Sequence, residues 1–145
     1  MSRTHYADIA SALDSQLNDL GELVSWENRH FTPPTDGTLY IRQTNLSGET
    51  TQADLGRDGQ DYTIGIYQVD VIAPFGKGKA ALYAMSDQVA DQFKRGTSLT
   101  YNGVVVRVRQ VVREPLVIDQ QTAILPISIY YETYTRTRDT SLVIV

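Results

Sequence analysis

The stretch 98–112, SLTYNGVVVRVRQVV, decides between a parallel and an antiparallel sheet. Asn102–Gly103 is the strongest short sequence signal for a type I′ turn, because both central residues of that turn need positive φ. The flanking runs are rich in β-branched residues, so the stretch predicts a β-hairpin. A last strand is expected at about 122–132, TAILPISIYYE, where Pro126 favours an edge, an end or a bulge.

Residues 69–87, VDVIAPFGKGKAALYAMSD, predict a strand, a tight glycine turn and a helix. Gly76, Gly78 and Ala81 match the G-x-G-x-x-A spacing of dinucleotide-binding units. Those units also need parallel strands and an acidic residue about 20 positions later. Position 96 is instead a glycine, and Lys79 lacks the following hydroxyl of a phosphate-binding P-loop. We therefore interpret the glycines as turn residues.

Two amphipathic helices are expected. The first spans 4–20 and ends at Gly21, and the second ends at Gly96. Their apolar stripes are Tyr6, Ile9, Leu13, Leu17 and Leu20 in the first helix, and Leu82, Met85, Val89 and Phe93 in the second.

Further strands are expected at 22–26, 39–46 and 62–73. The polar, glycine-punctuated residues 47–61 predict a mobile loop, or a hairpin tip joining the flanking strands. The element order is then α-β-β-β-α-β-β-β. This order is typical of an α+β domain, with a mainly antiparallel sheet packed against two α-helices, and residues 1–145 form one domain.

Composition excludes several classes of function. The 145 residues include no cysteine, which removes disulfides and thiolate metal sites. A net charge of −4 argues against a primary role in binding nucleic acid, and no apolar run is long enough to span a membrane. The two histidines, His5 and His30, stand apart and do not predict a metal site. No catalytic constellation or cofactor motif emerges.

The candidate interaction residues lie in three places. Arg107, Arg109 and Arg113 are expected on one face of their strand, opposite Val106, Val108 and Val112, as either a water-facing surface or an interface. Asp87 and Asp91 share a helix face, and they or residues 54–61 could offer an acidic patch to the arginines of a neighbouring subunit. The chain ends on an apolar run, which favours assembly: Leu142, Val143, Ile144 and Val145.

The chain resembles the tail terminator (tail completion) proteins of long-tailed bacteriophages. The resemblance rests on the opening helix and on four further stretches. These are VSWENRHFTPP (24–34), YIRQTNL (40–46), GIYQVDVIAPFGKGKAAL (65–82) and YNGVVVRVRQVVREPLVIDQQTAILPISIYYE (101–132). None is a catalytic motif, so the resemblance depends on their order and combination.

This resemblance implies a structural virion protein and no enzyme, cofactor or membrane contact. Such proteins form a homo-hexameric ring at the head-proximal end of the completed tail tube, after assembly in the host cytoplasm. The ring stops polymerisation of the major tail tube protein and offers a surface for head–tail joining, while DNA passes through without sequence-specific binding. Two alternatives stay open: a head–tail connector or stopper protein, and a small nucleotide-binding enzyme using the Gly76–Gly78 turn.

Overall fold

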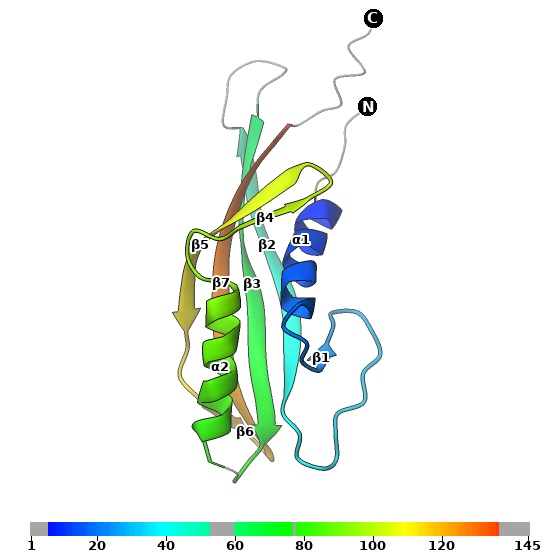
Figure 1. Cartoon of the computed structure of the whole chain (residues 1–145), viewed down its shortest axis with the longest axis vertical. Helices are drawn as coiled ribbons and strands as arrows, with labels where there is room; N and C mark the ends of the chain where they lie inside the picture. Colours follow the sequence, from blue (N-terminus) through cyan, green and yellow to red (C-terminus); the bar gives the residue numbers. More distant parts are fainter. Residues whose placement is uncertain (1–5, 53–59, 77, 137–145) are drawn as a thin grey trace, which may run out of the picture.

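A computed structural model describes residues 6–52, 60–76 and 78–136 as one curled sheet with two helices on one face (Figure 1). The seven strands have the order β1-β2-β3-β7-β5-β4, and β6 pairs with β7. The elements are α1 (Tyr6–Asn18), β1 (Val24–Ser25), β2 (Tyr40–Gln52), β3 (Gln60–Pro74), α2 (Ala80–Gln92), β4 (Ser98–Tyr101), β5 (Val104–Arg113), β6 (Val117–Asp119) and β7 (Thr122–Arg136).

The predicted α+β class and element order are confirmed, with the short strand β6 as the one addition. Only the β1–β2 pair is parallel among the described strands; all other pairs are antiparallel. The hairpin at Asn102–Gly103 is also confirmed, with φ of 51° and 81° at the two turn residues. The Asn102 side-chain amide donates to Asp8 at 3.1 Å, which ties this turn to the first turn of α1.

The core lies between the two helices and the sheet face that they cover. Alternate residues of β3, including Tyr67, Val69 and Val71, are fully buried against the helices, as the alternation in the sequence predicts. The Tyr67 ring packs on Phe93 just after α2, with ring centroids 5.8 Å apart. The helices also hold each other, because the Gln16 and Gln92 side-chain amides each donate to the other residue's backbone carbonyl, at 2.7 and 2.9 Å.

The prediction of a loop at 47–61 is wrong for residues 47–52 and 60–61, which belong to strands. β2 continues to Gln52 and pairs with β3 down to Asp61, and a register shift lies between Ser47 and Thr50. Gly48 lies at this shift, where a Cβ would overlap the Ile64 carbonyl. The alternative of a hairpin joining the flanking strands agrees with the antiparallel β2–β3 pairing. Residues 53–59 lie outside the described residues.

Pro126 does not lie on an edge strand. β7 is central, with β3 on one side and both β5 and β6 on the other. The Pro126 carbonyl accepts the Glu114 backbone N–H at 3.0 Å, so the imino nitrogen faces the same side. β5 has ended at Arg113 there, and β6 begins only at Val117. The proline is tolerated because the neighbouring strand is interrupted where its missing N–H would have donated.

Candidate subunit interface

A β-bulge in β5 decides where its arginines point. Val108 lies opposite Tyr131 and Gln110 opposite Tyr130, so Arg109 is an extra residue without a partner on β7. A single extra residue reverses the alternation of side chains beyond it. Before the bulge, even-numbered residues of β5 face the helices; after it, odd-numbered residues do.

The expectation that three arginines share one face is therefore wrong for Arg113. Arg113 lies opposite Ile127, a fully buried residue of the helix-covered face. Its Nη1 makes a 2.5 Å ion pair with Oδ1 of Asp87 on α2. Val112, expected on the apolar side, lies opposite Ser128 on the helix-free face. The bulge at Arg109 is the physical cause of both differences.

The other expected interaction residues are placed as follows. Asp87 forms an ion pair with Arg113 of its own chain, whereas Asp91 is exposed near the end of α2. Arg107 lies opposite Glu132 on the helix-free face, and Arg109 pairs with Glu132 through Nε–Oε1 at 3.6 Å. Leu142–Val145 lie outside the described residues.

Arg107 and Arg109 are joined by a third arginine that the sequence did not single out. The Gly96 N–H donates to the Val108 carbonyl and the Val108 N–H to the Thr97 carbonyl, each at 2.9 Å. These bonds hold the loop after α2 against β5, so Arg95 lines the same hollow as Arg107, Arg109 and Glu132. We call Arg95, Arg107 and Arg109 the basic edge.

A second hollow lies beside α1, next to β1 and β2. We call it the acidic cleft, after Asp14 of α1 and Glu27 of the loop that follows β1. It encloses about 480 Å³ and is open to solvent. Its lining is Ala10, Asp14, Ser15, Asn18, Trp26, Glu27, Arg29, Gln43 and Asn45.

Backbone and side-chain hydrogen bonds fix the position of both carboxylates in the cleft. Glu27 Oε1 accepts the Asn45 backbone N–H at 3.1 Å, and the Glu27 backbone N–H donates to Gln43 at 3.2 Å. Asp14 accepts the Tyr67 hydroxyl at 2.5 Å. Burial raises the pKa of Asp14 above 3.8, the Tyr67 bond opposes that change, and the nearby Glu27 charge raises it further.

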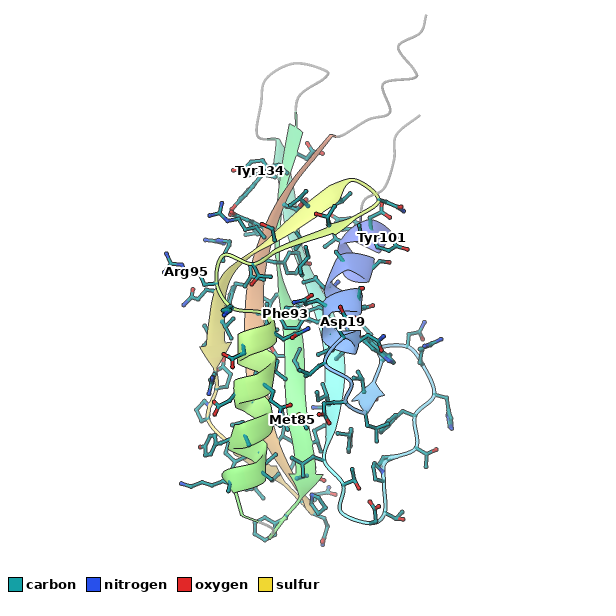
Figure 2. The ribbon with its side chains drawn as sticks, in the orientation of Figure 1. Asp19, Met85, Phe93, Arg95, Tyr101 and Tyr134 are labelled. Atoms are coloured by element: carbon teal, nitrogen blue, oxygen red, sulfur yellow. The ribbon has the colours of Figure 1, made fainter. Side chains whose placement is uncertain are left out.

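The basic edge and the acidic cleft lie on opposite flanks of the sheet. The cleft adjoins β1 and β2 at one end of the strand order, and the basic edge adjoins β5 near the other end. Figure 2 shows Arg95 on one side of the molecule and Asp19, just after α1, on the other. Sequence reasoning missed the cleft because Asp14 and Glu27 belong to separate elements. The only local signal was the position of Asp14, which directly follows Leu13 of the apolar helix stripe.

Other kinds of site find little support in the described ranges. No group of three or more metal-ligating side chains gathers among residues 6–52, 60–76 and 78–136. Neither described helix is long and apolar enough to cross a membrane. The glycine turn follows β3, which is antiparallel to both of its neighbours, β2 and β7. A dinucleotide-binding unit instead begins from a parallel strand.

Comparison with known protein families identifies the family to which this chain belongs. A family described as phage tail terminator protein matches residues 8–131, most of the chain and all the elements from α1 to the middle of β7. The chain belongs to the phage tail terminator family. Membership makes it a structural protein of the phage tail and therefore of the virion.

Solved structures share the fold of this chain. One structure, whose title gives no function, is 25% identical and covers 88% of this chain and 94% of its own, with a TM-score of 0.72. A chain from the virion of a native gene transfer agent particle shares the fold at 16% identity and a TM-score of 0.57. That match covers 90% of this chain and 98% of the virion chain. No protein with a curated description matches significantly.

Proposed function

We propose that this terminator caps the head-proximal end of the phage tail tube as a homo-hexameric ring. The ring stops addition of the major tail tube protein and offers the surface on which the head is joined. The observation that carries the proposal is the family match over residues 8–131. No catalytic step is part of this function.

The distribution of charge on the monomer supports ring formation. A closed ring needs a heterologous contact, in which two different surfaces of each subunit meet around the circle. The basic edge and the acidic cleft are two such surfaces, of unlike charge, on opposite flanks of the sheet. The apolar end of the chain, Leu142–Val145, supplies a further segment for contact with a neighbouring subunit or the tube.

The experiment is tail assembly with and without this protein. Its omission should give tubes of uncontrolled length that do not join heads, and adding the purified protein back should restore one length. Electron micrographs of the tubes provide the length distribution. Tubes of normal length that lack only heads would instead indicate the head–tail stopper function and would reject length control.

A further inference from the structure

The acidic cleft carries two carboxylates without a basic partner among the described residues. Neither Asp14 nor Glu27 is within ion-pair distance of a described lysine or arginine. Arg29 lines the same cleft but makes no ion pair with either carboxylate. Trp26 adds a half-buried aromatic ring to the lining. The cleft thus combines two fixed acceptors with a flat apolar surface.

The basic edge has the opposite imbalance. Its three arginines share a single described carboxylate, Glu132, which already pairs with Arg109 and accepts the Tyr62 hydroxyl at 2.8 Å. Arg95 and Arg107 are exposed and have no acidic partner among the described residues. Arginine suits insertion into a cleft of this kind, because its planar fork binds carboxylates and its face stacks on aromatic rings.

We infer that the basic edge of one subunit docks into the acidic cleft of a second copy of this chain, with Arg107 entering beside Asp14, Trp26 and Glu27. This inference rests on the proposed ring and names the contact that closes it. A second copy is the occupant argued here because the two surfaces are complementary in charge and lie on opposite flanks of one molecule. The same contact can therefore repeat around a circle.

This assignment replaces the acidic patch on α2 as the partner of the arginines. Asp87 already binds Arg113 in its own chain. The Glu27 charge repels the Asp14 carboxylate and contributes to the raised pKa of Asp14. An arginine inserted between the two carboxylates would relieve this repulsion. Charges at such a contact chiefly fix which surfaces meet and in what register.

The test reverses the charge on each surface separately and then on both. Arg107→Glu and Glu27→Lys should each raise the protein concentration needed for ring assembly by at least about tenfold at low ionic strength. The double variant should recover most of this loss, because opposite charges meet again at every contact. An equimolar mixture of the two single variants should also assemble, since the copies can alternate around a six-membered ring.

Matched controls lie at the other end of the molecule. Lys79→Glu, just before α2, and Asp119→Lys, at the end of β6, make the same charge changes at exposed residues, and both should assemble like the parent protein. Circular dichroism and thermal unfolding confirm that each variant is folded. Native mass spectrometry counts the subunits, and tube length measures capping on tube ends.

The outcomes separate the contact from the function. If the parent protein caps tubes and both single variants do so equally well, the inferred contact is wrong and the proposed function stands. If folded single variants fail but neither the double variant nor the mixture recovers, the pairing of these two surfaces is wrong. If the parent protein itself neither forms rings nor limits tube length, the proposed function fails and the contact falls with it.

Discussion

The buried hydroxyl of Tyr67 donates a 2.5 Å hydrogen bond to the Asp14 carboxylate, and so joins the middle of β3 to α1 at the acidic cleft. Tyr67 is fully buried, and Asp14 is half-buried with one side toward solvent. The bond therefore links the core to the surface that we propose as a subunit contact.

Tyr67→Phe should lower the free energy of unfolding by about 1–3 kcal/mol, because the half-buried carboxylate loses its donor. The same change should raise the pKa of Asp14 further, since the Tyr67 bond is what opposes the effect of burial. Urea unfolding measures the first effect and NMR titration of the carboxyl group the second. Asp14→Asn is the control, because it keeps an acceptor and removes the charge. An unchanged pKa would contradict this role for the hydroxyl.

The alkaline limb of stability should also depend on Tyr67. Burial, with the Asp14 charge and hydrogen bond, raises the pKa of Tyr67 far above its usual 10.0. Above pH 10 the unfolded chain releases this proton and the folded chain keeps it. The unfolded state then binds fewer protons, so the free energy of unfolding falls as pH rises, by up to about 1.4 kcal/mol per pH unit. Unfolding measured between about pH 9 and 11 should show a shallower fall for Tyr67→Phe; equal slopes would reject the prediction.

Gly65→Ala should destabilise the fold by about 1–3 kcal/mol. A Cβ at Gly65 would overlap the hydroxyl and ring of Tyr131, which lies directly opposite on β7. The Tyr131 hydroxyl donates to the Asn45 side chain at 3.1 Å, so displacement of the ring also breaks this bond. Combined with Tyr131→Leu, the alanine should cost much less, and a double-mutant cycle in urea measures the difference. Simple additivity of the two changes would show that the ring is not the obstacle.

Arg113→Ala should have little effect on stability, at most about 1 kcal/mol, because the side chains of Arg113 and Asp87 are 45% and 65% exposed. It should leave ring assembly unchanged, since this arginine is on the helix-covered side of the sheet and has its partner in its own chain. Arg107→Ala is the comparison and should weaken assembly. Equal loss of assembly in the two variants would place both arginines at the contact. It would contradict the inference that the bulge directs Arg107 and Arg113 to opposite faces of the sheet.

Elements with local sequence signals could be predicted, and those that depend on pairing between strands could not. The Asn102–Gly103 turn and the alternation around Tyr67 each depend on residues a few positions apart. The bulge at Arg109 has only a weak local signal: no glycine marks it, and the break in alternation at Arg109–Gln110 does not show which residue is the extra one. Its position shows only in the pairing of β5 with β7. The acidic cleft could not be predicted for the same reason, because only the folded sheet brings Glu27 beside Asp14.

The central place of β7 has a consequence for biosynthesis. β7 is the last described strand along the chain, yet β3, β5 and β6 all pair with it. While the ribosome is still adding the residues before Thr122, β3 and β5 each present an open edge with unpaired backbone groups. The sheet therefore cannot close during translation of its first six strands. Folding has to follow late, through pairings that are distant in sequence, and until then the nascent chain is exposed to aggregation.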